Sequence, residues 1–192
     1  MKNIVIPENR QLFSVAIKST EDKQYWMNEV SAMMETKKGM PMAIGRLVLD
    51  EILTNAMVRA PRHEDGSFKY QNKAEGSDIL IPHDSIELAP EDYVILQYGF
   101  YDDWVIMTCQ DPHGSLRKKE ILYRLNRHIS INPETDLPDG IADSHGRGIF
   151  LLREHLTYLI FNIQLNRKTE ILAFYHPHQD IPYKNISIYE TQ

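Results

Sequence analysis

Two pairs of strand-forming runs, each joined by a short polar turn, constrain the fold of this 192-residue chain more than any other feature. The first pair spans residues 92–110 and turns at Asp102 and Asp103. The second pair spans residues 158–176 and turns at 166–168. Both are rich in β-branched and aromatic residues, and such runs around a few turn residues are typical of β-hairpins. The sequence therefore predicts a sheet that is mainly antiparallel.

Helices are predicted both before and after the first hairpin. Apolar residues recur there at helical spacing, and Gly39, Pro41 and Pro61 interrupt the pattern. Because the helices gather in two groups instead of alternating with single strands, a parallel doubly wound fold is excluded. We expect an α/β fold, a two-layer sandwich whose mainly antiparallel mixed sheet is covered on one face by helices. The predicted helices cover 21–36, 42–59, 115–128 and 147–156, and a first strand covers 10–18.

One domain is expected over residues 1–192, with its core at about 10–176, because a chain of this length has room for one sizeable core. The tail from residue 177 onward shows no strong pattern. Residues 61–90 are polar and are predicted to be an insertion with short strands near 67–71 and 79–81.

Composition and charge narrow the class of protein. Apolar residues make up 42% and charged residues 25%, which is the balance of a globular protein and not of a disordered one. The net charge of −6 argues against direct binding of nucleic acid, which needs a basic face. We find neither a membrane-spanning run nor a signal-peptide pattern. Cys109, the single cysteine, is expected to be a small buried residue, and a cytoplasmic location is predicted.

Glu51 and Asn55 are four residues apart in a predicted helix, so both side chains project from the same face. A carboxylate and an amide oxygen are hard ligands that suit Mg²⁺. Glu51 is also placed to activate a hydroxyl or a water molecule. The competing interpretation is a solvated helix face, although Asn55 lies among apolar residues and asparagine disfavours helix interiors.

Asp111 comes at the end of the predicted strand that begins at Trp104, and Gly114 follows it closely. A carboxylate at a strand end can accept a hydrogen bond from the amino group of adenine. A glycine nearby lets the backbone approach the base. The competing interpretation is a plain turn, because Asp-Pro-x-Gly is a common turn sequence.

Gly146, Arg147 and Gly148 stand between a predicted loop at 130–145 and a predicted helix. Backbone N–H groups of such a loop, together with the helix N-terminus, can bind phosphate, and Arg147 can add charge-assisted hydrogen bonds. The competing interpretation is a glycine loop whose helix is capped by Ser144 or Asp143.

Other site classes receive less support. The chain has no Cys-x-x-Cys pair for a zinc ribbon and no P-loop signature. His176 and His178, with Asp180, form the best metal-binding pattern, but it lies in a weakly patterned tail where the proximity of a third ligand to the two histidines is not assured.

In this order, the segments around Glu51-x-x-x-Asn55-Ala56, Asp111-Pro-His-Gly114 and Gly146-Arg-Gly148-Ile149 resemble the N, G1 and G2 boxes of the GHKL ATPase superfamily, the Bergerat fold of gyrases, histidine kinases and heat-shock chaperones. The nearest likeness is to bacterial anti-sigma factors that are serine kinases. The resemblance covers residues 40–176. Thr169 matches the threonine with which that family helps to fix adenine.

The resemblance implies a Bergerat ATP-binding fold and a role for each residue. Glu51 would be the general base or orient the attacking group, Asn55 would hold Mg²⁺, and Asp111 would bind adenine with Gly114 beside it. The phosphates of ATP would lie against Gly146, Arg147 and Gly148. The chain departs from the family pattern at His113 and Ser115, where glycines are usual, and at Arg59, where kinases of this branch commonly have histidine.

The expected function is that of an ATP-binding serine/threonine kinase of anti-sigma type, which transfers phosphate to a partner protein such as a sigma factor or its antagonist. The alternative is a protein-interaction module that keeps the fold with weak or no nucleotide turnover. Assembly into a homodimer is compatible with this function, and the sequence leaves the oligomeric state open. A sensor histidine kinase, a gyrase or a chaperone would need segments for which we find no room in 192 residues.

Overall fold

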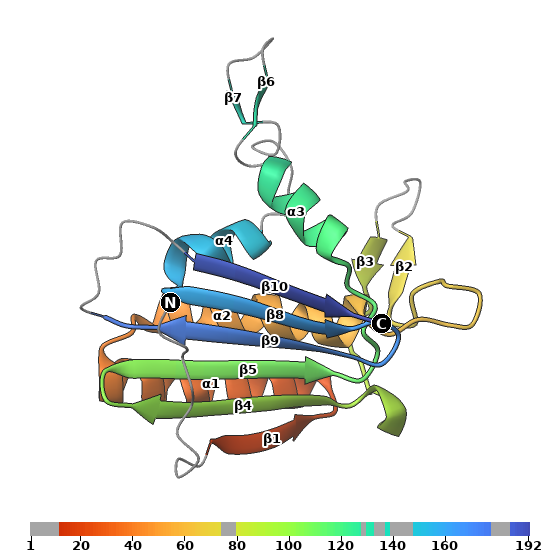
Figure 1. The fold of residues 1–192 in the computed structure, drawn as a ribbon. Helices are drawn as coiled ribbons and strands as arrows, with labels where there is room; N and C mark the ends of the chain where they lie inside the picture. Colours follow the sequence, from red (N-terminus) through yellow and green to blue (C-terminus); the bar gives the residue numbers. More distant parts are fainter. Residues whose placement is uncertain (1–11, 74–79, 128–129, 133–136, 139–147, 178–184) are drawn as a thin grey trace.

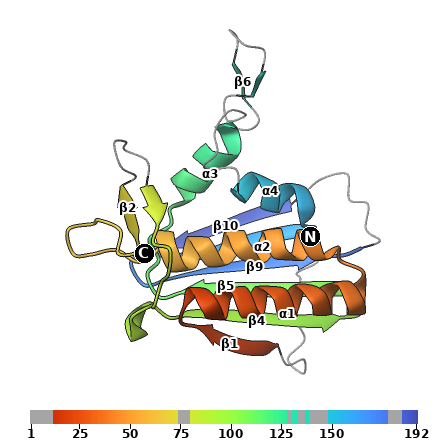
Figure 2. The ribbon, with the colours of Figure 1, turned by 180° about the vertical axis from the view of Figure 1, so that it is seen from behind.

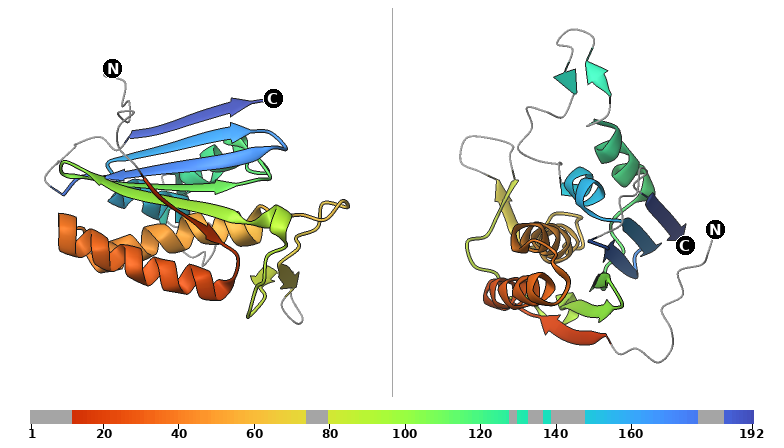
Figure 3. Two further views of the ribbon diagram at one scale, coloured as in Figure 1. Left: turned by 90° about the horizontal axis from the view of Figure 1, so that it is seen from below. Right: turned by 90° about the vertical axis from the view of Figure 1, so that its left-hand side faces the viewer.

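The computed structural model of this protein describes residues 12–73, 80–127, 130–132, 137–138, 148–177 and 185–192. Within them, a six-stranded sheet carries helices on one of its faces (Figure 1, Figure 2). Seen from below, the sheet and the long helices form two distinct layers (Figure 3). The predicted two-layer α/β sandwich is therefore confirmed.

The strands of the sheet lie in the order β1, β4, β5, β9, β8, β10. Both predicted hairpins are confirmed, and their turns place Asp102 and Asn166 at positive φ, +46° and +59°, which these residue types tolerate better than most. All neighbouring strands are antiparallel except β8 and β10. The bounds are Phe13–Ile17 for β1, Val94–Tyr101 for β4, Trp104–Asp111 for β5, Tyr158–Gln164 for β8, Lys168–Tyr175 for β9 and Asn185–Thr191 for β10.

Strand β10 is the main element that the sequence did not reveal. It pairs in parallel with β8, so that Ile186 lies opposite Leu159 and Ile188 opposite Phe161. The alternation of Ile186 and Ile188 with polar residues is the period of a half-buried strand and was the available signal. Its partner lies at a distant position in the sequence, so only the tertiary structure identifies it as an edge strand.

Helices α1 (Thr20–Lys38) and α2 (Met42–Thr54) pack against each other and against the sheet. The hydroxyl of Ser19 caps α1 by accepting a hydrogen bond from the backbone N–H of Asp22. Gly39 ends the helix with φ +65°, a left-handed conformation that favours glycine. These caps explain why the helix runs beyond the predicted 21–36 at both ends.

A π-helical turn, η1 (Asn55–Arg59), follows α2 directly. Its signature is the hydrogen bond from Ala60 N to Asn55 O at 3.0 Å, which closes a wider ring than an α-helix does. The predicted helix at 42–59 is therefore correct in extent but wrong in its last turn. Such π turns are rare and recur at functional sites, which draws attention to Asn55.

The remaining elements are short. Helix α3 begins three residues later than its prediction of 115–128, and the strand predicted at 67–71 is wrong, because residues 62 and 68 form only an isolated bridge and the strand starts at Gln71. The bounds are Gln71–Lys73 for β2, Leu80–Pro82 for β3, Pro90–Asp92 for the 3₁₀ turn η2, Lys118–Arg127 for α3, Ile131–Asn132 for β6, Leu137–Pro138 for β7 and Gly148–His155 for α4.

The hydrophobic core lies between α1, α2, α4 and the inner face of the sheet. Its largest fully buried side chains include Phe161, Leu49 and Met107. Cys109 is buried among them, as expected, and burial raises the pKa of its thiol well above the usual value. Among the described residues, no helix combines the length and the apolar character needed to cross a membrane.

Candidate functional site

A hollow opens where η1, the end of β5, the start of α3 and β9 come together, at the end of the sheet where β5 finishes (Figure 1). Its empty volume is about 470 Å³, part of it open to solvent. The walls combine small or apolar side chains with charged ones at the rim. They comprise Asn55, Ala56, Arg59, Ala60, Arg62, Phe68, Asp111, Ser115, Leu116, Glu120, Arg124, Thr169 and Ile171.

The hollow brings together three of the predicted site residues, Asn55, Asp111 and Thr169, from three separate segments. Glu51 and Gly148 contact each other beside Asn55, without lining the hollow. Gly114 lies behind the turn that follows Asp111. Gly146 and Arg147, with Ser144, lie outside the described residues.

Asp111 forms the floor of one end of the hollow. The residue is 5% exposed, and its Oδ1 accepts hydrogen bonds from the backbone N–H groups of His113 at 2.9 Å and Gly114 at 3.2 Å. Burial raises the pKa of Asp111, while these two backbone donors, the nearby His113 ring and the Thr169 hydroxyl act in the opposite direction. Through Oδ1, the Asp111 side chain thus stabilises the turn that follows it.

Thr169 lies directly opposite Asp111 in the ladder between β5 and β9. Its hydroxyl is buried, and although it is near enough to affect Asp111, it has no partner with hydrogen-bond geometry among the described residues. A buried hydroxyl without a partner costs free energy. A ligand that entered the hollow would therefore find an unused donor and acceptor next to a carboxylate.

Gly114 is required by the packing of the protein itself. Its φ is +59°, and a Cβ atom there would lie 2.0 Å from the backbone oxygen of Gln164 and 2.8 Å from the backbone nitrogen of Arg167. The backbone N–H of Asn166 donates to the oxygen of Gly114 at 3.1 Å. The close approach predicted toward a base is thus made, in this structure, toward the β8–β9 turn.

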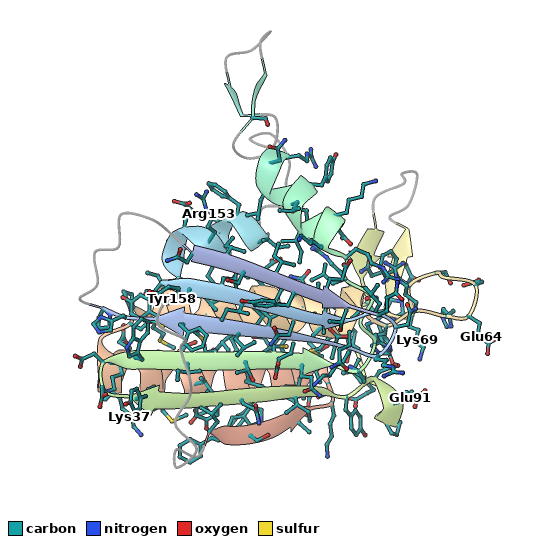
Figure 4. The ribbon with its side chains drawn as sticks, in the orientation of Figure 1. Lys37, Glu64, Lys69, Glu91, Arg153 and Tyr158 are labelled. Atoms are coloured by element: carbon teal, nitrogen blue, oxygen red, sulfur yellow. The ribbon has the colours of Figure 1, made fainter. Side chains whose placement is uncertain are left out.

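A buried carboxylate, Asp92, holds the Asp111 turn to the polar segment 61–73. Lys69 Nζ lies 3.0 Å and Tyr70 Oη 2.8 Å from Asp92 Oδ2, and both donate to it. His113 Nε2 lies 3.1 Å from Asp92 Oδ1, close enough for an ion pair but without hydrogen-bond geometry. Figure 4 shows Lys69 at this end of the molecule, near Glu91, whose carboxylate is 3.7 Å away.

The sequence did not identify this network. Its partners come from segments that are far apart in the chain, and Asp92 by itself looks like an ordinary acidic residue before a strand. An available signal was the pair of aromatic residues Phe68 and Tyr70 inside an otherwise polar stretch. The segment predicted to be an insertion is therefore tied to the candidate site.

The opposite end of the hollow is built by one face of α2 and η1. The Asn55 Nδ2 group donates to the backbone oxygen of Glu51 and to its carboxylate Oε1, both at 2.7 Å. Arg59 Nη1 donates to Asn55 Oδ1 at 3.0 Å. Both oxygen and nitrogen of the Asn55 amide therefore have partners within the same helical face.

Gly148, the first residue of α4, is pressed against Glu51. A Cβ atom at position 148 would lie 1.7 Å from Glu51 Cδ, so the absence of a side chain is what lets the carboxylate reach this place. The positive end of a helix favours a carboxylate. The structure thus joins the first and third predicted motifs through Glu51 and Gly148.

Three arginines surround the same end, and the sequence had singled out only Arg59. Arg124 forms an ion pair with Glu120 one turn earlier in α3, and Arg62 stacks on the ring of Phe68 with its Cζ 4.1 Å from the ring centre. Burial lowers the pKa of Arg59, Arg124 lowers it further, and Glu51 and Glu120 raise it. Arginine remains protonated under all such shifts.

The residues around Asn55 do not fit a magnesium site as they stand. The amide oxygen that would bind the metal already accepts a hydrogen bond from a guanidinium, and the Glu51 carboxylate accepts one from the Asn55 amide. The part of the chain that the structure describes contains no group of three or more His, Cys, Asp or Glu residues able to hold a metal ion. His178 and Asp180 lie outside it.

A comparison with profiles of known protein families finds no match, and a comparison with curated proteins finds no relative.

Proposed function

We propose that this protein binds ATP in the hollow between Asn55 and Asp111, in a Bergerat-type fold, and acts as a regulatory serine/threonine kinase of GHKL type on a partner protein. The observation that carries the proposal is the convergence of Asn55, Asp111 and Thr169 on one hollow. These residues come from the segments that resemble the N and G1 boxes and from the hairpin with the matching threonine.

The chemistry of the hollow supports a purine at the Asp111 end. The two hydrogen bonds that the carboxylate accepts from the described backbone both end at Oδ1, which leaves Oδ2 to accept from an exocyclic amino group. Thr169 supplies a buried hydroxyl without a partner among the described residues. Ala56, Leu116 and Ile171 provide apolar surface for the ring.

The phosphates would extend toward the arginines. Arg59, Arg62 and Arg124 line the hollow, and Glu120 is the carboxylate paired with one of them. Guanidinium groups bind phosphate oxygens through pairs of charge-assisted hydrogen bonds. Phosphoryl transfer in such a site depends on positioning and charge neutralisation more than on covalent chemistry.

A second candidate is a nucleotide-dependent interaction module that does not turn ATP over. Glu51, the predicted general base, accepts a hydrogen bond from Asn55, packs against Gly148 and is not among the residues that line the hollow. A base must lie within hydrogen-bond reach of the hydroxyl from which it takes the proton. This observation favours binding without transfer.

The first experiment measures the melting temperature with and without ATP. Binding to the native state raises the melting temperature by mass action, and we expect an increase of several degrees at saturating ATP. Asp111→Asn should remove the increase: with Oδ1 held by two backbone donors, the new amide would point an N–H₂ group at the amino group of adenine. Wild-type protein that shows no increase with ATP would refute the proposed site.

The second experiment separates the two candidates. ADP release from ATP, and transfer of a γ-labelled phosphate to a protein encoded beside this one, should both be lost in Glu51→Ala if Glu51 acts in transfer. Glu51→Gln is the matched variant, since it keeps the size of the side chain and can still accept from Asn55. ATP binding with no ADP release in the wild type would select the interaction module.

A further inference from the structure

Arg59 occupies the oxygen that the resemblance assigns to a metal. Its Nη1 donates to Asn55 Oδ1 at 3.0 Å, while the amide nitrogen of Asn55 donates twice to Glu51. Asn55 and Arg59 are the first and last residues of the π turn, four positions apart. The positive charge next to the amide oxygen of Asn55 is therefore supplied by the protein itself, by the guanidinium of Arg59.

The surroundings of Arg59 discourage a second cation at the same place. Arg124 is near enough to act on its charge, and Arg62 lines the same hollow. Glu51 and Glu120, the carboxylates that face it, accept from Asn55 and pair with Arg124 respectively. Mg²⁺ requires an octahedron of oxygen ligands and gives up its waters reluctantly, and a neighbouring guanidinium repels it.

We propose that Arg59 takes the place of the divalent cation, so that this protein binds the phosphates of a nucleotide without Mg²⁺. The proposal rests on the nucleotide site described above and adds to it the identity of the charge that neutralises the phosphates. Among the described residues, one guanidinium N–H donates to Asn55, and phosphate oxygens would be bound by the other N–H groups. Asn55 is then a positioning residue for Arg59 and not a metal ligand.

The test is calorimetric titration of the full chain with ATP at matched ionic strength, once with excess EDTA and once with MgCl₂. For the wild type, removing the metal should change Kd by less than about threefold. Arg59→Ala frees Asn55 Oδ1 and removes the built-in charge, so its affinity in EDTA should fall at least about tenfold. In MgCl₂ the variant should regain part of that loss, which would make it metal-dependent.

Arg46→Ala is the matched control, because Arg46 is an exposed arginine on α2 that does not line the hollow. It should bind ATP like the wild type in both buffers. Arg59→Lys keeps a positive charge and should remain independent of the metal, with a weaker affinity. Urea midpoints of each variant show whether it folds, and if Arg59→Ala does not, the wild type and Arg59→Lys decide the result.

The outcomes separate this proposal from the proposed function. Wild-type binding that weakens about tenfold or more in EDTA overturns the role of Arg59 and leaves the ATP site in place. Unchanged binding by a folded Arg59→Ala in EDTA overturns it as well. Absence of ATP binding in both buffers refutes the ATP site, and the role of Arg59 with it.

Discussion

The two ends of the hollow differ in how their polar groups are used. At the Asn55 end, the amide, the carboxylate of Glu51 and the guanidinium of Arg59 are paired with one another. At the Asp111 end, the backbone takes one carboxylate oxygen and the Thr169 hydroxyl has no hydrogen-bond partner among the described residues. The polar groups of the first end are thus held together by pairing among themselves, whereas the second end keeps a polar group that a ligand of the proposed site could use.

In the proposed site, the two halves are therefore preorganised in opposite ways. A buried unpaired hydroxyl lowers stability and is satisfied by a ligand. Polar groups that are paired within the chain are stable without a ligand. Perturbing the Asp111 end should therefore change stability and binding in different directions, and four substitutions test this.

Gly114→Ala should have the largest effect on stability. The new Cβ would collide with backbone atoms of the β8–β9 turn at positive φ, and we expect the free energy of unfolding to fall by about 3 kcal/mol. Gly39→Ala is the control, because Gly39 has a similar φ of +65° but no atom within 4 Å of its Cβ position. Urea unfolding of both variants separates the two effects, because Gly39→Ala introduces the backbone strain alone and Gly114→Ala adds the collision. Equal losses would show that the Gly114 contact contributes nothing.

Asp92→Asn should come next. The substitution removes the charge that Lys69 and Tyr70 contact in a fully buried position, and a loss of about 2 kcal/mol is expected. Because His113 lies against the same carboxylate, the Asp111 turn should loosen, which amide hydrogen exchange would detect at Gly114. Glu91→Gln is the control, since Glu91 also pairs with Lys69, at 3.7 Å, but its carboxylate is exposed to solvent. A stable Asp92→Asn variant with unchanged exchange at Gly114 would show that the contacts of Asp92 do not hold the Asp111 turn.

Thr169→Val should raise stability while weakening ligand binding. It replaces a buried hydroxyl that has no partner among the described residues by a methyl group in a strand, and an increase of about 1 kcal/mol is expected for the free protein. The ATP-induced rise in melting temperature should become smaller. Thr108→Val is a comparison in the adjacent strand, because the Thr108 hydroxyl donates to Gln97 and its loss should destabilise. A destabilised Thr169→Val would mean that the hydroxyl has a partner.

Asp111→Asn should have the smallest effect on the free protein, and the effect should depend on pH. Burial raises the pKa of Asp111 above its ordinary 3.8, so below pH 3.8 the protonated side chain contributes its full stabilisation to the folded wild type. This stabilisation is lost as the pH rises through the raised pKa. Asparagine does not titrate, so the variant should match the wild type near pH 3 and exceed it at pH 7 by less than about 1 kcal/mol. Urea unfolding across this pH range measures the difference in the free energy of unfolding between the variant and the wild type. A difference that became smaller as the pH rose would contradict a raised pKa for Asp111.

Local signals in the sequence account for most of the fold. The hairpin turns at Asp102 and Asn166, the cap at Gly39 and the helical spacing of apolar residues depend on neighbours within a few positions, and all were predictable. The π turn at Asn55 was not, because it differs from an α-helix by one residue in hydrogen-bond register. Strand β10 was missed because its alternating pattern is short, with Ile186 and Ile188 as its two aliphatic residues, and its pairing with β8 is seen only in the tertiary structure.

The candidate site divides in the same way. Glu51, Asn55, Asp111 and Gly148 could be named from residue types and spacing alone, since each short motif carries its own chemistry, whereas Thr169 was named only through the resemblance to the GHKL family. The tertiary structure decided which of these residues meet and what they contact. It placed Gly114 against a turn and Gly148 against Glu51.

The amino-acid sequence by itself determined the class of the fold and the residues worth testing, because propensity, period and turn chemistry act over a few positions. Only the tertiary structure decided that Arg59 donates to Asn55 and that Asp92 ties Lys69 to the Asp111 turn. Hydrogen bonds and ion pairs depend on distances of a few ångströms between groups, and those distances are set when separate segments pack together.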